Sequence, residues 1–292
     1  MSFRGSHTAL VTPFRGGELD ETAFRLLIEG QVGAGIEGIV PVGTTGESPT
    51  LTHEEHIAVI RIAVDAAAGR CKVIAGTGSN STSEAISLTA EAKTLGADAA
   101  LLVAPYYNKP SPEGLYRHFR AISEAVDIPI VLYSIPGRCG VEIDVKTVTR
   151  LASDCPNIVA IKEAGGSVER VSQLRTALPE AFEILSGDDS LTLPFLSVGA
   201  VGVISVASNV IPAEVGHLVR SWLAGRVDEA ASIHRKYYQL FKDLFLEPNP
   251  APTKYVLSLL GQMTPEVRLP LCEMEEASKE RVHDTISRVG IL

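Results

Sequence analysis

The sequence predicts an α/β fold: a (β/α)8 TIM barrel with a small C-terminal α-helical appendage. Short apolar runs recur about every 25 to 30 residues, and a polar turn and a helical pattern follow each of them, which is typical of a βα repeat. Eight such units precede residue 225. Eight parallel strands can close into a barrel, whereas the competing doubly wound sheet usually has fewer strands and a nucleotide-binding fingerprint.

The eight predicted strands are short and apolar, as expected for strands buried on both faces. They lie at residues 8–13, 38–42, 72–76, 99–104, 130–135, 158–162, 182–186 and 202–206. Amphipathic patterns at 54–67 and 83–95 predict two of the connecting helices. Because the active site of such a barrel lies at the carboxyl ends of its strands, the residues just after each run are the first candidates for function.

The βα repeat ends near Gly225, and the rest of the chain has helical patterns separated by turns that contain proline and glycine. These helices are predicted at 228–246, 252–260 and 272–289. We therefore expect two parts, a catalytic barrel over residues 1–225 and a helical region over residues 226–292.

Composition excludes several classes of protein. The net charge is −9 and the basic residues form no stripe, which argues against a nucleic-acid partner. The longest apolar stretches, 97–105 and 198–206, are far shorter than the ~20 residues of a membrane-spanning helix. The first residues lack the apolar core of a secretory signal, so a cytoplasmic location is the default expectation. The four cysteines are scattered without a CxxC pair, which predicts reduced thiols.

Motifs for cofactors and metals are incomplete. The segment 76–81 lacks the third glycine of a dinucleotide fingerprint, and the chain has no lysine-bearing phosphate loop. The segment 46–50 lacks the last glycine of a nucleophile elbow, which argues against a serine hydrolase. His53 and His56 have the wrong spacing for a zinc-protease helix. We expect neither a metal nor an external cofactor.

Lys162 is the strongest candidate for a nucleophile, because it interrupts an apolar run that is otherwise typical of a buried strand. A solvated lysine has a pKa of ~10.4, so it is almost entirely protonated at neutral pH and attacks carbonyls poorly. Burial penalises the ammonium form, and a pKa lower by ~3 units needs roughly 4 kcal/mol of differential destabilisation. The expected chemistry is an imine with a keto acid. From this segment alone, a lysine paired with Glu163 or another carboxylate is an equally weighted alternative.

The second predicted strand leads into a loop rich in glycine and hydroxyl groups, residues 43–48. Its glycines permit a tight turn, and the hydroxyls of Thr44 and Thr45 can converge with backbone N–H groups on a small carboxylate. An ordinary glycine-rich turn with a capping hydroxyl is the alternative, and the loop alone favours it. Lys162 on the same rim favours a binding role.

Three other strand ends carry polar side chains. The fifth strand places Tyr133 and Arg138 at the catalytic face, where a phenol can relay protons and a guanidinium can bind a second carboxylate. Taken singly, each is at least as well explained as an aromatic residue filling the barrel mouth or as a surface arginine. The fourth strand ends in Tyr106 and Tyr107, which are expected to face different directions, so that one can reach beyond its own subunit. The acidic pair at 188–189 is interpreted as turn chemistry with a minor site role.

Five short motifs together resemble the dihydrodipicolinate synthase family, over nearly the whole chain. They are Gly-Thr-Thr-Gly-Glu-Ser-Pro-Thr at 43–50, Pro-Tyr-Tyr-Asn-Lys-Pro at 105–110, Tyr-Ser-Ile-Pro-Gly-Arg at 133–138, Ile-Lys-Glu-Ala at 161–164 and Ser-Gly-Asp-Asp at 186–189. Their order and spacing are jointly specific, and they resemble the synthase more closely than its sister pyruvate aldolases. Ser134 stands where the family commonly has asparagine and Cys139 where it has threonine or serine, so both bear on fine substrate preference.

The resemblance implies that Lys162 forms an imine with pyruvate, which condenses with aspartate 4-semialdehyde and cyclises to 4-hydroxy-tetrahydrodipicolinate, committing carbon to lysine and diaminopimelate. It implies a proton relay of Thr44, Tyr133 and a Tyr107 lent by a neighbouring subunit, in a homotetramer built as a dimer of dimers. The other substrate contacts that it implies are the pyruvate carboxylate near Thr45, the semialdehyde carboxylate at Arg138, and pocket lining at Gly187 and Ile204.

The resemblance also implies a second site, at which feedback-sensitive members bind L-lysine at the dimer interface. The matching positions are Ser48, His53, His56, Asn80, Glu84 and Tyr106. Asn80 and Glu84 lie four apart at the start of one predicted helix, and the two histidines lie three apart on another, so each pair is expected to share a face. The alternative is a capping box of Thr52 and Glu55 followed by exposed histidines.

Two rival functions remain open. The nearer is another imine-forming pyruvate lyase, acting on N-acetylneuraminate or on a 2-keto-3-deoxy sugar acid. Arg138 argues against it, because a sugar-specific site is expected to offer more neutral hydroxyl-binding groups. The more distant is a non-catalytic barrel that binds small ligands or regulates a partner, and the complete set of Lys162, Tyr133, Thr44 and Tyr107 weighs against that.

Overall fold

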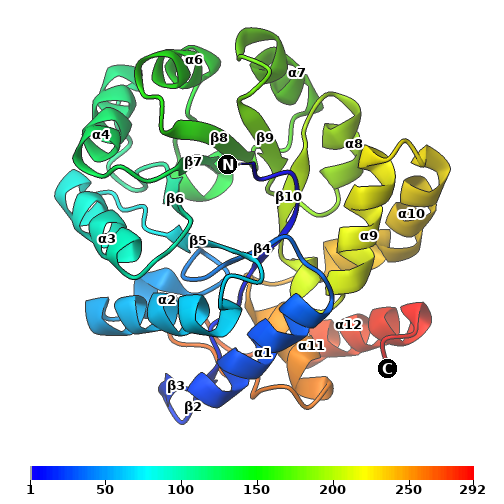
Figure 1. Ribbon diagram of the computed structural model, residues 1–292. Helices are drawn as coiled ribbons and strands as arrows, with labels where there is room; N and C mark the ends of the chain where they lie inside the picture. Colours follow the sequence, from blue (N-terminus) through cyan, green and yellow to red (C-terminus); the bar gives the residue numbers. More distant parts are fainter. Residues whose placement is uncertain (1) are drawn as a thin grey trace.

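The strands close into a parallel barrel, which confirms the predicted (β/α)8 fold (Figure 1). The structure is a computed structural model that describes residues 2–292. The order around the barrel is β1-β10-β9-β8-β7-β6-β5-β4, and a hairpin of β2 (Phe14–Arg15) and β3 (Glu18–Leu19) lies outside it. The barrel strands are β1 (Gly5–Ala9), β4 (Gly38–Val40), β5 (Lys72–Gly76), β6 (Ala99–Val103), β7 (Ile130–Ser134), β8 (Ile158–Glu163), β9 (Glu183–Ser186) and β10 (Gly202–Ser205).

A ring of helices surrounds the strands (Figure 1). Its members are α1 (Glu21–Gly33), α2 (His53–Ala67), α3 (Thr82–Thr94), α4 (Pro112–Ala125), α6 (Val145–Asp154), α7 (Val168–Ala177), α8 (Thr192–Ser197) and α9 (Pro212–Leu223). Short helical turns also follow three strands: η1 (Ser48–Thr50), α5 (Pro136–Cys139) and η2 (Ala207–Asn209). Several helix starts are fixed by side chains that accept a first-turn N–H, namely those of Asp20, Thr52, Ser111, Asp144 and Ser167.

Alternation along the strands decides which side chains fill the barrel. Val131, Tyr133 and Ala160 belong to a buried cluster inside the barrel. Their neighbours in sequence, such as Leu132 and Ile161, pack in a separate cluster with helix residues. A side chain two positions beyond Ala160 on β8 therefore enters the interior near its carboxyl end.

The first strand begins three residues earlier than predicted and ends at Ala9 rather than residue 13. Its polar residues are fully buried and hydrogen-bonded: Ser6 Oγ donates to Glu37 at 2.7 Å, and Thr8 Oγ1 donates to Gln31 at 2.5 Å. Partners more than twenty residues away made this polar segment compatible with a buried strand. A prediction based on local apolarity therefore selected the buried residues just beyond it.

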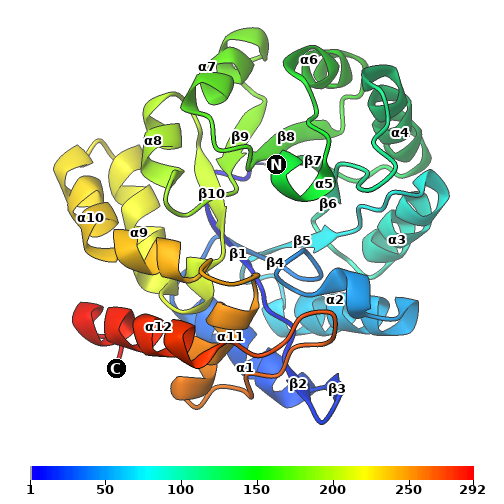
Figure 2. The ribbon, with the colours of Figure 1, turned by 180° about the vertical axis from the view of Figure 1, so that it is seen from behind.

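The chain beyond the barrel forms α10 (Val227–Asp243), α11 (Ala251–Leu259) and α12 (Glu276–Val289). The last helix begins four residues later than predicted. These helices share one hydrophobic cluster with α9 and β10, and they lie beside the barrel wall (Figures 1 and 2). The connection before α12 crosses to the β2–β3 hairpin, where Glu266 accepts the N–H groups of Gly16 and Gly17. Within residues 2–292, no helix combines the length and apolarity needed to cross a membrane.

Candidate active site

Lys162 and Tyr133 are neighbours on adjacent strands, because the β7–β8 register pairs these two residues. The Lys162 ammonium lies 4.1 Å from the centre of the Tyr133 ring, and the lysine is only 5% exposed. Burial lowers the pKa of Lys162 to about 7; the charge of Asp189 opposes this shift, and the charge of Arg138 adds to it. A large fraction of this amine is therefore unprotonated near neutral pH, as a carbonyl nucleophile requires.

Glu163 does not pair with Lys162, so that alternative is wrong. Consecutive residues of a strand point to opposite faces, and the Glu163 carboxylate accepts from Arg170 Nε at 2.8 Å on the other side. Burial raises the pKa of Glu163, while the Arg170 charge and hydrogen bond oppose that shift. Within residues 2–292, no carboxylate forms a salt bridge with Lys162, and Glu163 is paired with Arg170.

The Tyr133 hydroxyl remains a neutral donor, since burial raises its pKa to about 12. A hydrogen bond with the Thr44 side chain and the charge of Arg138 oppose this shift without cancelling it. Thr44 and Tyr133 also line the same cavity of about 30 Å³, at the junction of the β4 and β7 ends. The predicted phenol–hydroxyl pair is thus brought together, within the reach of Lys162.

The other predicted pocket residues surround this pair. Thr45 is buried, and its hydroxyl accepts from Asn249 Nδ2 at 2.9 Å. Gly187 packs directly on Lys162, because a Cβ at that position would lie 3.0 Å from the lysine Cε. Ile204 belongs to the same interior cluster as Tyr133. These contacts fix the lysine stem and leave its amine at the carboxyl end of the barrel.

Arg138 and Tyr107 differ in their relation to the pocket. Arg138 is exposed on α5, yet its charge is close enough to lower the pKa of both Lys162 and Tyr133. Tyr107 is 91% exposed and has a φ of +71°, so its ring projects away from the interior of its own chain. Within one chain it does not join the Tyr133–Thr44 pair.

Asp189 is a site residue whose importance the sequence interpretation underestimated. The interpretation as a turn residue is confirmed for Asp188, whose carboxylate accepts the N–H groups of Ser190 and Leu191. Asp189 is instead buried, and it accepts from Ser205 Oγ at 2.5 Å and from the backbone N–H groups of Val206 and Ala207, which follow β10. Burial raises its pKa, and these donors oppose the shift. Its position directly after an apolar strand, on the same rim as Lys162, was the available signal.

Asp189→Asn is expected to lower the pKa of Lys162 further, because the carboxylate charge of Asp189 raises it. The free amine would then persist to lower pH, and the acid limb of imine formation would move in the same direction. The measurement is the rate of borohydride trapping of pyruvate between about pH 5 and pH 8, a range that brackets a lysine pKa of about 7. Asp188→Asn is the matched control and should leave the limb in place. An unmoved limb in Asp189→Asn would mean that Asp189 is uncharged.

Five of the six residues predicted for a second site line one cavity of about 180 Å³ between α2 and α3. They are Ser48, His53, His56, Glu84 and Tyr106. The Glu84 carboxylate contacts His53 Nε2 at 2.7 Å, and Ser79 also donates to it. These hydrogen bonds lower the pKa of Glu84, so the cavity has an anionic wall.

Asn80 does not line this cavity, and the predicted shared helix face of Asn80 and Glu84 is wrong. The helix begins at Thr82 after the cap Ser81, so Asn80 lies in the preceding loop, where its amide donates to Tyr106 O at 3.2 Å. The capping box of Thr52 and Glu55 is confirmed. The exposed-histidine alternative holds for His53 only, since His56 is buried with its Nε2 2.9 Å from the carbonyl oxygen of Gly76.

Two residues that hold the loop after β4 (the β4 loop, residues 42–48) were missed by the sequence analysis. Lys254 is fully buried and forms an ion pair with Glu47, and Asn249 holds Thr45 as described above. The signal for Lys254 was present, because this lysine interrupts an apolar helix in the same way that Lys162 interrupts an apolar strand. Among residues 2–292 there is no cluster of three histidine, cysteine or acidic side chains arranged to hold a metal ion.

The known proteins that this chain resembles agree with the active-site geometry described above. The model of the dihydrodipicolinate synthetase family matches residues 2–289. The 4-hydroxy-tetrahydrodipicolinate synthase of Aquifex aeolicus is 52% identical to this chain, over 99% of this chain and 98% of its own length. That of Endomicrobium trichonymphae is 50% identical, over 99% of each chain.

Solved structures with the same fold include the 4-hydroxy-tetrahydrodipicolinate synthase of Methylacidiphilum fumariolicum SolV. It has a TM-score of 0.98 at 55% identity, with 99% of this chain and 96% of that chain covered. The enzyme of Cyanidioschyzon merolae, solved with lysine bound, has a TM-score of 0.97 at 44% identity, with 99% of both chains covered. On this evidence, and on the geometry of its site, the chain belongs to the dihydrodipicolinate synthetase family.

Proposed function

We infer that this chain is a lyase that condenses pyruvate with L-aspartate 4-semialdehyde to 4-hydroxy-tetrahydrodipicolinate, the first committed step of lysine and diaminopimelate biosynthesis. The observation that carries this conclusion is Lys162, a buried amine with a pKa of about 7 beside the Tyr133 phenol at the active end of the barrel. Relatives about half identical in sequence over their whole length bear the name of that activity.

The site accounts for each bond change. The free amine of Lys162 attacks the keto carbon of pyruvate, and loss of water gives the imine. Loss of a methyl proton gives an enamine, whose carbon forms a bond with the aldehyde carbon while the aldehyde oxygen takes a proton. The amino group of the second substrate then attacks the imine carbon, closes the ring and releases Lys162. The imine itself withdraws electrons in this scheme, so no external cofactor is required.

Proton transfers in these steps are proposed to pass through Tyr133 and Thr44. The neutral phenol can donate a proton when water leaves and can accept one through the Thr44 hydroxyl. The β4 loop with Thr45 is proposed to hold the pyruvate carboxylate. Arg138, which is exposed on α5, is proposed to hold the carboxylate of the semialdehyde.

A comparison of acceptor aldehydes tests this function. The rate of pyruvate consumption should be much higher with aspartate 4-semialdehyde than with N-acetylmannosamine or small sugar aldehydes. Arg138→Met should raise the semialdehyde KM about 10- to 100-fold, as expected for a lost charge-assisted hydrogen bond, and leave the pyruvate KM nearly unchanged. Preference for a sugar aldehyde would retain the Lys162 imine but reassign the chain to a sister aldolase.

We also propose a homotetramer in which a neighbouring copy lends Tyr107 to the relay. Its 91% exposed ring and left-handed backbone fit a side chain presented to another subunit. One solved relative, 39% identical, is described as a monomeric variant, so membership of the family does not decide the oligomeric state. A single-chain mass in sedimentation at working concentration would contradict the proposal. The cytoplasm is the proposed location, since all four cysteines are free thiols.

Inhibition by L-lysine is proposed at the cavity lined by His53, His56 and Glu84. The Glu84 carboxylate offers a partner for an ammonium group, and one solved relative is described with lysine bound. Millimolar L-lysine is expected to inhibit the condensation, and Glu84→Gln should raise the half-inhibitory concentration about tenfold, because a charge-assisted contact is lost. Uninhibited turnover at millimolar lysine in the unaltered protein would reject this site.

A further inference from the structure

The loop after β4 is held in a conformation that its own sequence does not favour. In the β4 loop, defined here as residues 42–48, Val42 has a φ of +51° and Glu47 a φ of +54°. Left-handed backbone is uncommon for residues other than glycine, and it is a true outlier for a β-branched side chain such as valine. Such conformations persist where surrounding contacts impose them.

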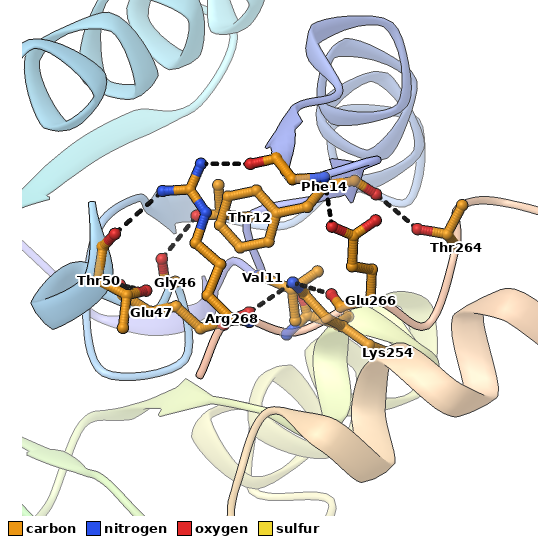
Figure 3. Close-up of polar contacts among 12 residues, drawn as sticks. Val11, Thr12, Phe14, Gly46, Glu47, Thr50, Lys254, Thr264, Glu266 and Arg268 are labelled. Atoms are coloured by element: carbon orange, nitrogen blue, oxygen red, sulfur yellow. Dashed lines mark hydrogen bonds and ion pairs between the residues drawn. The ribbon is translucent and has the colours of Figure 1, made fainter. Parts of the chain in front are cut away.

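The principal contact is a buried ion pair with the C-terminal helical region (Figure 3). Lys254 on α11 donates to Glu47 Oε1 at 2.5 Å, and the two side chains are 0% and 1% exposed. The lysine also donates to the carbonyl oxygen of Glu266 at 2.8 Å, and its ammonium lies 4.2 Å from the centre of the Phe14 ring. Glu47 Oε2 accepts the backbone N–H of Arg268 at 2.9 Å.

Glu47 is joined through the backbone of the β4 loop to Thr44, which carries one of the hydroxyls of the site. Its N–H donates to Thr44 O at 3.1 Å, in the turn that presents Thr44 to Tyr133. The next residue back along the chain, Gly46, accepts from Thr12 Oγ1 at 2.7 Å (Figure 3). Asn249, five residues before Lys254, holds the Thr45 hydroxyl. Displacement of the Glu47 side chain would therefore move the segment that carries both threonines.

We propose that Lys254 is a positioning residue for imine formation: by holding Glu47 it fixes the β4 loop in the shape that presents Thr44 to Tyr133 and Thr45 to the pyruvate carboxylate. This inference rests on the proposed function of the site. Lys254 itself touches neither substrate. Its position in the chain assigns the C-terminal helical region a part in catalysis, 207 residues from the loop that it holds.

A purely structural role is the competing explanation, and the surroundings of the pair argue against it. A buried ion pair contributes little net stability relative to apolar side chains of similar volume, because both charges lose their hydration. The same cluster already contains apolar packing partners, including Phe14. Unlike apolar packing, the ion pair links Lys254 to one particular carboxylate, that of Glu47. Glu47 lies at the end of the β4 loop and has a left-handed backbone conformation.

The test compares Lys254→Met with Glu47→Gln by borohydride trapping of pyruvate at Lys162 and by steady-state turnover. In Lys254→Met, half-maximal trapping should need about tenfold more pyruvate and kcat should fall about 10- to 100-fold, as expected when catalytic groups are misplaced by about 1 Å. The semialdehyde KM should stay within about twofold, because Arg138 lies on α5 and not on the β4 loop. Glu47→Gln keeps one oxygen that can accept from Lys254 and loses the acceptor of the Arg268 N–H, so the link to α11 is retained in part and its effects should be smaller.

Arg281→Met is the matched control. It removes an ion pair with the buried Asp243, at 2.9 Å between α12 and α10, in the same helical region and without contact to the β4 loop. Arg281→Met should have the same half-maximal pyruvate for trapping and the same kcat as the unaltered protein. If Lys254→Met melts at lower temperature but traps and turns over pyruvate normally well below that temperature, the pair is only structural and the inference fails.

A double variant covers the case in which Lys254→Met does not fold. Lys254→Met with Glu47→Gln buries no unpaired charge, so it should fold, yet it lacks the link and should still need about tenfold more pyruvate. Normal half-maximal trapping in the double variant would overturn the inference. Failure of the proposed function would give a different result, because the unaltered protein would trap pyruvate but not condense it with the semialdehyde. The pyruvate concentration for half-maximal trapping could still be compared between the variants and the unaltered protein.

Discussion

Replacing Lys162 with arginine is expected to abolish borohydride trapping of pyruvate and to lower kcat by about 10⁴-fold or more, the scale of removing a covalent nucleophile. Arginine keeps the positive charge and a long side chain, but its guanidinium stays protonated and offers no free amine. Lys93→Arg, the same change at an exposed lysine of α3, is the matched control and should trap normally. Trapping that survives in Lys162→Arg would place the imine elsewhere and remove the basis of the proposed function.

The pH dependence of the unaltered protein belongs to the same prediction. The protonated lysine is inert, so trapping should rise about tenfold per pH unit on the acid side and level off above a pKa of about 7. A lysine with its ordinary pKa would instead give a rate that still climbs between about pH 8 and pH 10. Such a profile would show that the amine is hydrated and that burial does not activate it.

The sequence identifies those parts of the site that depend on local pattern. An ammonium within an apolar run marks Lys162, and period-two alternation places it on the inner face of its strand. The register between β7 and β8 then makes Tyr133 its neighbour, and any closed parallel barrel brings their strand ends to the same rim. For these residues, sequence pattern and fold class predict the shared rim, and the structure adds the register that makes them neighbours.

The partners of buried charges could not be predicted, because they depend on contacts between distant segments. Glu163 was an available partner for Lys162 in the sequence, but the strand directs it to Arg170 on the opposite face. Asp189 resembles a turn residue in the sequence, and only the fold shows its three donors, Ser205 at the end of β10 and the N–H groups of Val206 and Ala207. The apolar surroundings of Lys254 in the sequence indicate that this lysine is buried, but only the completed fold shows that Glu47 is its partner. Asn80 is a different case, because the helix predicted at 83–95 already excluded it, and the shared face with Glu84 was inferred from the four-residue spacing alone.

Tyr133→Phe is expected to separate imine formation from turnover. The ring stays beside Lys162, so burial of the amine is retained and trapping with pyruvate should still saturate. Without the hydroxyl the relay to Thr44 is lost, and kcat should fall by about 10²- to 10⁴-fold, the usual contribution of a positioned acid or base. A kcat within a few-fold of normal would show that another group moves these protons.

Mixing two inactive variants determines whether the relay crosses between subunits. If Tyr107 is lent by a neighbour, Tyr107→Phe should also be nearly inactive. Reassociation of equal amounts of Tyr133→Phe and Tyr107→Phe would then create mixed pairs with one site intact and the other doubly altered. With half of the pairs mixed and half of their sites intact, about a quarter of normal activity should return, as a two-fold interface requires. If both tyrosines served a site within their own chain, every site in the mixture would lack one of them, and no activity would be recovered.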